Sequence, residues 1–308
     1  MAAKLNVGLR LPAVHGVKMS DLRAFVLAAE ELGFHSIWVG DHVYHHVDVL
    51  QPLELLTWVA ALTNRVRLGT AVMLTAYLNP VLLAKAAASL DYMSGGRLQL
   101  GISIGGTPAE YKSIGVPVNQ RVGRLLENVA IMRALWSGDD ISYEGRYNQI
   151  EGGNIKPKPV QKPGVPLYFG ANTDAMLRRA ARHADGWVGS AGPSAAKYLE
   201  GVTLIRHAAS EMGRDPDSVA LAKLQGVSVH QNRAQAKVLA ERQWQSYYSP
   251  RFDVDASTIY GTPDEVATKL SEFANAEAPE ITLALEPPTL DLDLLALLFE
   301  TTQVFSRK

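Results

Sequence analysis

The chain has 308 residues, of which 47% are hydrophobic and 20% are charged, and its formal net charge is -1. A chain of this length and composition buries a sizeable core, so disorder is not expected. The near-neutral charge and the lack of a Lys/Arg-rich run provide no broad positive field for nucleic acid or an anionic membrane. With no cysteine in the chain, disulfides, zinc–thiolate sites and thiol nucleophiles are excluded.

The first residues, MAAKLNVGLRLP, contain no apolar run of signal-peptide length. No later stretch reaches the roughly 18 uninterrupted apolar residues of a membrane span. We therefore expect a cytoplasmic protein whose partner is a small molecule, with no nucleic acid and no membrane.

In the first half of the chain, short β-rich runs alternate with helical patterns, which is typical of parallel strands joined by crossover helices. A helix is predicted over residues 20–32 and ends at Gly33, a natural C-terminal cap. Another begins at Asn79 as N-cap, with Pro80 at its first position, and ends at Gly95 and Gly96. A long helix follows over residues 119–136. The strands expected in this half are residues 5–11, 35–40, 65–74 and 97–103.

The regular alternation breaks between residues 137 and 166. DISYEGRYNQI reads as a small hairpin, and KPKPVQKPGVP suits neither a helix nor a central strand, because proline removes backbone donors and fixes φ. We interpret this segment as an insertion within one domain. Beyond it, helices are expected between the remaining strands, which are residues 166–170, 186–190, 220–230 and 280–286.

Eight strands, each followed by a helix, predict a single α/β domain over residues 1–308, folded as a (β/α)8 TIM barrel with the insertion at 137–166. A doubly wound open sheet is the alternative. It is weakened because no G-x-G-x-x-G follows the first strand, where a dinucleotide-binding fold would place its phosphate loop.

In a β/α barrel the active site forms at the carboxyl ends of the strands. The segment FGANTDAM ends a strand at Gly170 and starts a helix near Asp174, so its backbone amides suit an anion such as phosphate. The alternative is that Asn172 or Thr173 only caps the helix. SIGGTPAEY is a second glycine-rich loop at this end. The candidates by position are Asp41, His42, Thr70 to Thr75, Ser103 to Thr107, Gly170 to Thr173, Trp187, His230 and Glu286.

VGDHVYHH, residues 39–46, holds three histidines. Its H-x-x-H-H spacing lacks the helical pattern of H-E-x-x-H, and Arg10, Leu11 and Pro12 stand where a metal-dependent amidohydrolase barrel would place His-x-His, so no metal site is predicted. His42 directly follows a strand, and an imidazole titrates near neutral pH, so it is the candidate for proton exchange. The alternative is a purely structural histidine. His45 and His46 are expected to shape the entrance.

Four blocks in order give the chain a family resemblance. They are LGTAVMLTAYLNPVLLAKAAASLDYMSGGRLQLGIS (68–103), KPKPVQKPGVPLYFGAN (156–172), ARHADGW (181–187) and YGTPDEVATKL (260–270). Together they resemble the luciferase-like monooxygenase superfamily of barrel enzymes, which use a flavin or the deazaflavin coenzyme F420.

The resemblance implies that the tricyclic ring lies across the barrel mouth and that its phosphate meets the loop after the fifth strand. It also implies a non-proline cis peptide or bulge near the end of the third strand, pressed against the ring. The residues expected at the cofactor are Thr70, Ala71, Val72, Met73, Ser103, Gly105, Gly106, Gly170, Ala171, Asn172, Thr173 and Trp187.

Two features bear on which cofactor is used. GDH at residues 40–42 resembles the Asp-His pair of the deazaflavin branch, in which the histidine faces the reactive carbon of the ring. FMN-using members carry a phosphate-binding arginine in the loop where this chain has Ile104. F420 is therefore preferred and FMN is the alternative. Because Gly106 and Ala109 replace the glutamate and asparagine of the sugar-phosphate dehydrogenases, a glucose-6-phosphate oxidoreductase is not predicted.

The resulting hypothesis is an F420-dependent oxidoreductase that transfers a hydride between C5 of the deazaflavin and a small organic substrate. His42 would handle the proton and Asp41 would orient His42. The alternatives are an FMN-dependent monooxygenase and a barrel that binds such a cofactor without turnover. The resemblance also favours a homodimer.

Overall fold

The computed structural model describes residues 2–12, 16–192 and 194–305. Eight parallel strands close into a barrel, since β12 lies beside β1 and β10 lies beside β9. The predicted barrel is confirmed, and the open-sheet alternative is wrong. In barrel order the strands are β1 (Lys4–Arg10), β2 (Ser36–Val39), β3 (Arg67–Thr70), β5 (Leu98–Ser103), β8 (Leu167–Gly170), β9 (Gly186–Gly189), β10 (Ala220–Val229) and β12 (Glu280–Glu286).

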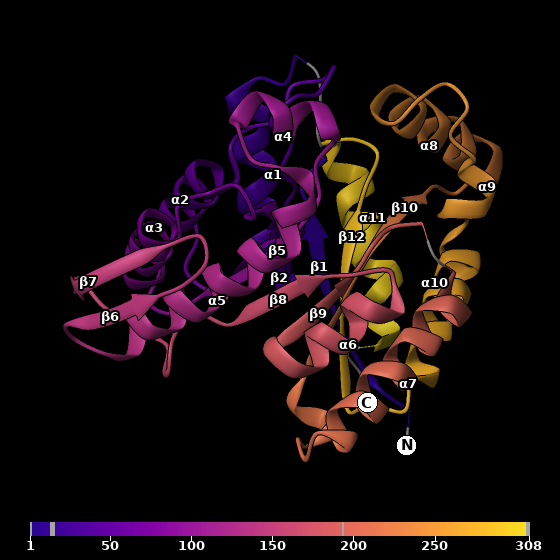
Figure 1. Cartoon of the computed structure of the whole chain (residues 1–308). Coiled ribbons are helices and arrows are strands. Elements are labelled where there is room, and N and C mark those ends of the chain that lie inside the picture. Colours follow the sequence, from indigo (N-terminus) through magenta and orange to yellow (C-terminus); the bar gives the residue numbers. More distant parts are fainter. Residues whose placement is uncertain (1, 13–15, 193, 306–308) are drawn as a thin grey trace.

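Helices surround the barrel, and α4 and α8 lie at one end of it, at the top of Figure 1. The longer helices are α1 (Met19–Leu32), α2 (Pro52–Leu62), α3 (Pro80–Met93), α5 (Arg121–Ser137), α6 (Asp174–His183), α7 (Ala195–Glu211), α8 (Arg233–Tyr247), α10 (Pro263–Ser271) and α11 (Leu292–Thr302). The shorter ones are α4 (Pro108–Ile114) and α9 (Val254–Ser257). The predicted caps of α3 and α1 are confirmed: the Asn79 side chain accepts from the Val81 amide at 2.9 Å, and Gly33 adopts φ 101°. Within the described residues, no helix has the length and apolar character that crossing a membrane requires.

The third predicted strand is interrupted. β3 ends at Thr70, the peptide between Ala71 and Val72 is cis, and the chain pairs with β5 again only at β4 (Met73–Leu74). The expected non-proline cis peptide is therefore confirmed. β11 (Thr258–Gly261) was not expected from the sequence: it pairs with the last residues of β10, from Gly226 to Val229.

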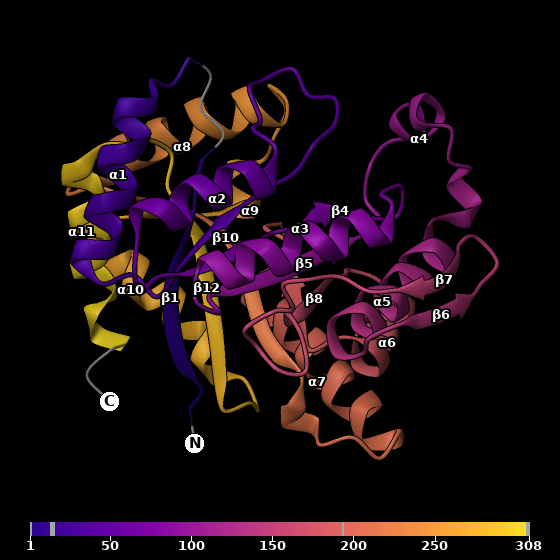
Figure 2. The same ribbon diagram turned by 90° about the vertical axis from the view of Figure 1, so that its left-hand side faces the viewer.

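The insertion forms the antiparallel hairpin β6 (Ile141–Glu144) and β7 (Gln149–Gly153), which extends beside α5 in Figure 2. The proline-rich segment after it is tied back to the barrel's helix layer, because the Lys158 ammonium donates to the Leu135 carbonyl at 2.8 Å. The insertion predicted at 137–166 thus lies alongside the barrel.

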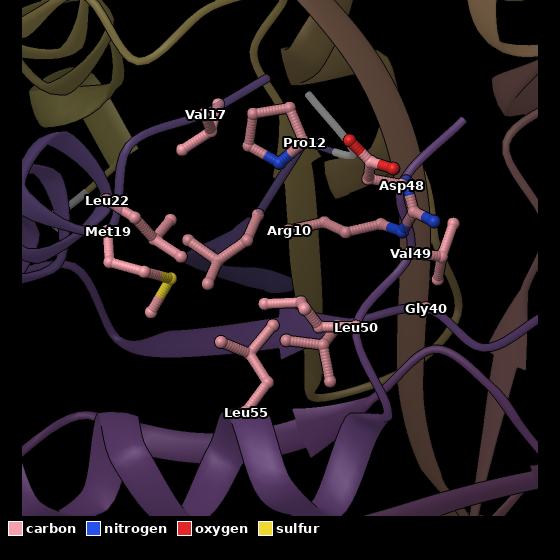
Figure 3. Close-up of a pocket in the computed structure, with 12 residues that line it drawn as sticks. Arg10, Pro12, Val17, Met19, Leu22, Gly40, Asp48, Val49, Leu50 and Leu55 are labelled. Atoms are coloured by element: carbon pink, nitrogen blue, oxygen red, sulfur yellow. The ribbon is translucent and has the colours of Figure 1, made fainter. Parts of the chain in front are cut away.

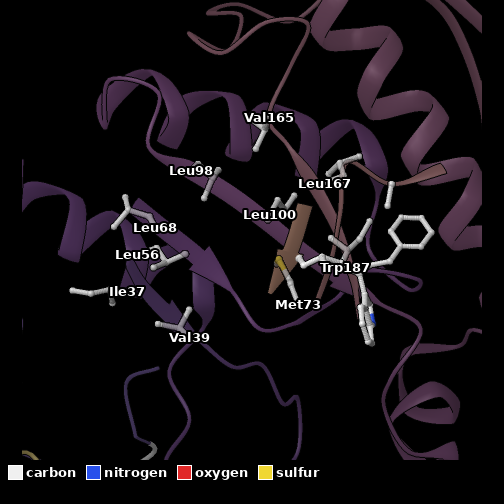
Figure 4. Close-up of a cluster of buried hydrophobic side chains, with 14 of the residues drawn as sticks. Ile37, Val39, Leu56, Leu68, Met73, Leu98, Leu100, Val165, Leu167 and Trp187 are labelled. Carbon is white, nitrogen blue, oxygen red and sulfur yellow. The ribbon is translucent and has the colours of Figure 1, made fainter. Parts of the chain in front are cut away.

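The main core lies between the strands and the helices, where outward-pointing strand residues such as Leu68, Leu98 and Leu167 gather (Figure 4). A smaller cluster fills the barrel itself. Its members are Trp38, Ala71, Tyr168, Val188, Ala222, Leu224 and Ala284. Because successive strand residues face opposite sides, this inner cluster identifies which strand residues point into the barrel interior.

Candidate functional site

The loop after β2 carries the predicted catalytic pair. The Arg10 guanidinium lies so close to the backbone of Gly40 that a Cβ at this position would collide with it. The next residue, Asp41, accepts a hydrogen bond from the Leu74 amide at 2.9 Å. Burial raises the pKa of Asp41, and the Leu74 N–H partly opposes that rise. The partner of its carboxylate is therefore the backbone of β4, and the expectation that Asp41 orients His42 stays a prediction.

His42 is half-buried at the barrel mouth. Its ring centroid lies 4.5 Å from that of His45 and 6.0 Å from that of Tyr247 in α8. Burial lowers the pKa of His42 below 6.5, and the nearby His45 and Arg10 lower it further. The imidazole is therefore mainly neutral at pH 7 and available as a proton acceptor.

The other two histidines extend an aromatic stack rather than surround a cation. His45 lies 4.6 Å from the Tyr247 ring and 4.5 Å from the His46 ring, measured between centroids. The His46 Nε2 atom lies 2.7 Å from the Ser246 carbonyl oxygen. Among the residues that the structure describes, no group of three His, Cys, Asp or Glu side chains could hold a metal ion.

Glu110, in the helix that follows β5, holds the histidine loop in place, a role that the sequence reasoning missed. Its carboxylate accepts from the amides of Val43 and Tyr44, each at 3.2 Å, and from the Thr107 amide at 2.5 Å. These hydrogen bonds outweigh the effect of burial and lower the pKa of Glu110. The spacing from Thr107 to Glu110 is that of a capping box, which can be recognised in the sequence. The hydrogen bonds from the histidine loop to Glu110 cannot be recognised there, because they join residues far apart in the chain.

Arg10 and Glu286 form a buried ion pair at the same end of the barrel. The register pairs Leu9 with Leu285, so the next residues of β1 and β12 are neighbours that both face inward. Only 5% of Arg10 and 1% of Glu286 is exposed, and Arg10 Nη1 contacts Glu286 Oε1. Burial alone would lower the pKa of Arg10, but the Glu286 carboxylate and the Tyr247 hydroxyl raise it. The guanidinium is therefore charged, and it is already paired with the Glu286 carboxylate.

Across the mouth from this pair lies a cavity of about 360 Å³ between the ends of β3, β5, β8 and β9. It brings together many of the predicted cofactor residues, which are Ala71, Val72, Ser103, Gly105, Gly170, Ala171, Asn172 and Thr173. A Cβ on Gly170 would meet the Val72 side chain at 2.9 Å, so glycine keeps this end of β8 clear. The arrangement suits a flat apolar ring against Ala71 and Val72.

The polar end of this cavity is suited to an anion. Thr173, the N-cap of α6, makes no side-chain hydrogen bond to the helix, so the capping alternative is not supported for this residue. The amides of Met176 and Leu177 donate to the Thr173 carbonyl, each at 2.9 Å, which leaves the amides of Asp174 and Ala175 and the helix dipole to meet an anion at this end of the cavity. Arg121, at the start of α5, also lines the cavity and forms no ion pair with a described residue. Sequence reasoning missed Arg121 because it is distant in the chain from both cofactor loops.

Four predicted cofactor residues lie outside the described lining of this cavity. The Thr70 hydroxyl donates to the Gly101 carbonyl at 2.6 Å, Met73 is buried in the core, and Gly106 lies beside Tyr111. The fourth is Trp187.

The expectation for Trp187 is corrected, because its indole points away from the barrel interior. The ring stacks on Tyr198 of α7 with centroids 4.6 Å apart, within the core shown in Figure 4. Its Nε1 donates to the Ala171 carbonyl at 2.9 Å. Trp187 therefore supports the loop after β8 from behind.

Lys223 of β10 is a second supporting residue that was not predicted. Burial lowers its pKa to about 7, and its amine donates to the carbonyls of Ser190, at 2.6 Å, and Leu224, at 2.7 Å. It thus fixes the end of β9 where Ser190 lines the cavity. His230 has a local role, since its Nδ1 accepts from the Asn232 amide at 2.9 Å.

Comparison with known proteins identifies relatives of this chain. The chain is 36% identical over 191 residues to an F420-dependent glucose-6-phosphate dehydrogenase of Kineococcus radiotolerans, a match that covers 59% of this chain and 55% of that protein. It is 31% identical over 230 residues to the protein of the same name from Gordonia bronchialis, covering 71% of this chain and 67% of that one.

A solved structure of an F420-dependent secondary alcohol dehydrogenase in complex with an F420-acetone adduct shares the fold, with a TM-score of 0.84, 21% identity and full coverage of both chains. Residues 6–280 match the family model described as luciferase-like monooxygenase. The chain belongs to the luciferase-like monooxygenase family.

Proposed function

We propose that this protein is a coenzyme F420-dependent oxidoreductase that acts on a small organic substrate. The observation that carries the proposal is the placement of a mainly neutral His42 at the same barrel mouth as the cavity that suits a ring and an anion. The relatives named as F420-dependent enzymes, at 31% and 36% identity, support the choice of cofactor.

In this proposal the residues of the cavity divide the task of binding. Ala71 and Val72 form an apolar wall for the ring, while the first turn of α6 and Arg121 receive the phosphate. When bound, F420 supplies a carbon that accepts or donates a hydride. The protein orients the substrate and excludes water, and His42 takes up or returns the proton at its imidazole.

Two hydrogen-bonded supports keep His42 in place. Asp41, the residue before His42, accepts a hydrogen bond from the Leu74 amide of β4. The Glu110 carboxylate accepts from the amides of Val43 and Tyr44, the two residues that follow His42. Because the residues on both sides of His42 are fixed, one to β4 and the others to α4, the imidazole keeps one position relative to the cavity. Such preorganisation is what proton transfer in a short-lived transition state requires.

An FMN-dependent monooxygenase is the second candidate. Arg121 favours it, because this guanidinium supplies the cation that Ile104 does not provide for the doubly charged phosphate of FMN. Reduced FMN reacts with oxygen, whereas reduced deazaflavin does not, so the two candidates differ in an observable way.

Titration of the purified protein with F420 and with FMN tests the proposal. We expect F420 to bind at least tenfold more tightly, and we expect the protein to leave the rate of oxygen uptake by reduced FMN at its protein-free value. Tighter binding of FMN, together with formation of an oxygenated product from an added substrate, would replace the proposal by the monooxygenase. Tight F420 binding with no turnover over a broad substrate panel would point to a non-catalytic binding protein.

The proposal includes a cytoplasmic homodimer. Exposed apolar side chains on α3 offer a surface for a second copy, since Leu82 is 71% exposed and Tyr92 and Met93 are each 61% exposed. Sedimentation analysis of the wild type and of Leu82→Glu would show whether this face holds a dimer.

A further inference from the structure

A cavity of about 330 Å³ lies at the amino end of the barrel, the end at which the chain begins in Figure 1, opposite the mouth that holds the cofactor cavity. Its polar lining comes from the first residues of the strands. His35 directly precedes β2, Arg67 begins β3, and Gln99 and Tyr168 are the second residues of β5 and β8. Glu280, at the start of β12, is exposed at the rim, so the cavity is open to solvent.

Three polar atoms of this lining are buried and have no hydrogen-bond partner among the described residues: Gln99 Oε1, Arg67 Nε and His35 Nδ1. Only 7% of Gln99 is exposed, and its amide nitrogen donates to the Tyr168 hydroxyl at 2.9 Å. Burial raises the pKa of Tyr168 to about 12, so the phenol keeps its proton and can donate it to a ligand. Since buried polar groups are nearly always paired, this group of donors and acceptors points to a ligand.

Arg67 brings a charge to the cavity and forms no ion pair with a described residue. Its Nη2 donates to the neutral side chain of Gln161 at 3.2 Å. Arg10 differs: it lies at the opposite end of the barrel, where Figure 3 shows it, and it is paired with Glu286. His35 adds no second cation, because burial and the nearby Arg67 lower its pKa.

The other charged groups around the cavity already have partners. Asp217 is paired with Arg206, and Glu280 lies 3.5 Å from the Lys4 ammonium. One positive charge, that of Arg67, is therefore left to be balanced among the described residues. A ligand with a single negative charge balances it, whereas a second negative charge would face the two rim acids without a cation of its own.

We propose that the amino end of the barrel binds a small monocarboxylate that carries a hydroxyl group and a short hydrocarbon chain. The carboxylate accepts from Arg67 Nε and from the Tyr168 hydroxyl, a pairing that a guanidinium makes well. The hydroxyl of the ligand donates to Gln99 Oε1. The hydrocarbon chain lies against Val219 and Leu221, which form part of the apolar side of the lining.

This ligand is an effector and not a substrate, because it lies far from the reacting atoms. The cofactor cavity and this cavity share no lining residue, and the apolar cluster inside the barrel lies between them, with Leu224 at the first and Tyr168 at the second. Because the site exists only in the folded barrel, its occupation should raise Tm.

Calorimetric titration tests the assignment without relying on activity. The probes are 2-hydroxy-4-methylpentanoate, 4-methylpentanoate, which lacks the hydroxyl, the methyl ester of the hydroxy acid, which lacks the charge, and inorganic phosphate. We expect the hydroxy acid to bind about tenfold or more tightly than each of the others, and to raise Tm. Equal binding of the ester or of 4-methylpentanoate, or tighter binding of phosphate, would overturn the assignment.

Matched variants locate the binding. Arg67→Gln should weaken binding of the hydroxy acid by about tenfold or more, while Arg23→Gln, which removes the same charge from an exposed position of α1, should leave it unchanged. If Arg67→Gln does not fold, Gln99→Met replaces it, because this change removes the unpaired acceptor and keeps the length of the side chain. Unchanged affinity in the folded variant would overturn the assignment.

A competition experiment separates this site from the barrel mouth. Saturating F420 should leave the affinity for 2-hydroxy-4-methylpentanoate unchanged, because the two cavities lie at opposite ends of the barrel. Displacement of the hydroxy acid by F420 would place it at the mouth and overturn the assignment.

Discussion

Removal of the acid from the buried ion pair should destabilise the barrel strongly. Glu286→Gln leaves the Arg10 guanidinium, which is 5% exposed, without its carboxylate at the junction of β1 and β12. Breaking a buried pair in this way typically costs about 3–5 kcal/mol. At about 2.1 cal/mol/K per residue, a chain of 308 residues has an unfolding entropy of about 0.65 kcal/mol/K, so Tm should fall by about 5–8 °C.

Replacing both partners should restore most of the loss. In Arg10→Met with Glu286→Leu neither charge is buried, and such hydrophobic replacements are often neutral or stabilising. Differential scanning calorimetry of the wild type, Arg10→Met, Glu286→Leu and the double variant gives the coupling free energy directly. A single variant that loses less than about 1 kcal/mol, or a double variant whose loss equals the sum of the two, would show that the pair is not electrostatically coupled.

Three further predictions concern the site. His42→Ala should leave cofactor affinity within about tenfold and lower turnover by roughly 10² to 10⁴. Because burial lowers the pKa of His42, the acidic limb of the wild-type kcat/KM profile should lie below pH 6.5. An unaffected rate in the variant, or a limb above pH 6.5 in the wild type, would show that His42 does not exchange the proton. Arg121→Gln should weaken cofactor binding by about tenfold, as expected for about 1.5 kcal/mol of charge-assisted hydrogen bonding, and should reduce the salt dependence of Kd; equal affinities at all ionic strengths would contradict this. Glu110→Gln should lower Tm at pH 7, and the difference should vanish as pH falls below 4.5, because a depressed pKa stabilises the fold only while the carboxylate is ionised; a difference that is independent of pH would refute the assignment.

The barrel could be predicted because its signals are local. Strand and helix runs alternate, and residues such as Asn79 and Gly33 mark helix ends through their own backbone preferences. Strand β11 escaped prediction because Thr258–Gly261 is short and joins the sheet outside the closed barrel, beside the end of β10. Its existence depends on a long-range pairing that no local pattern expresses.

The location of the site residues could be predicted more successfully than the groups that they contact. Many of the residues expected at the cofactor do meet at one cavity, because parallel strands bring their carboxyl ends together. The error for Trp187 has a simple cause: strands of a covered barrel are buried on both faces, so hydrophobicity does not reveal which face a residue takes. For Asp41 the partner is a backbone amide, which side-chain patterns cannot indicate.

The hydrogen bond from the Leu74 amide to Asp41 joins two parts of the molecule that would otherwise adjust separately. Asp41 adjoins His42, and Leu74 lies two residues beyond Val72, whose side chain forms part of the cofactor cavity. Displacement of that wall by an arriving ring would therefore be transmitted to the imidazole over a very short path. Occupation of the cofactor cavity should therefore be felt at the loop that carries the proton-exchanging group, so the order in which cofactor and substrate arrive becomes a property of the fold.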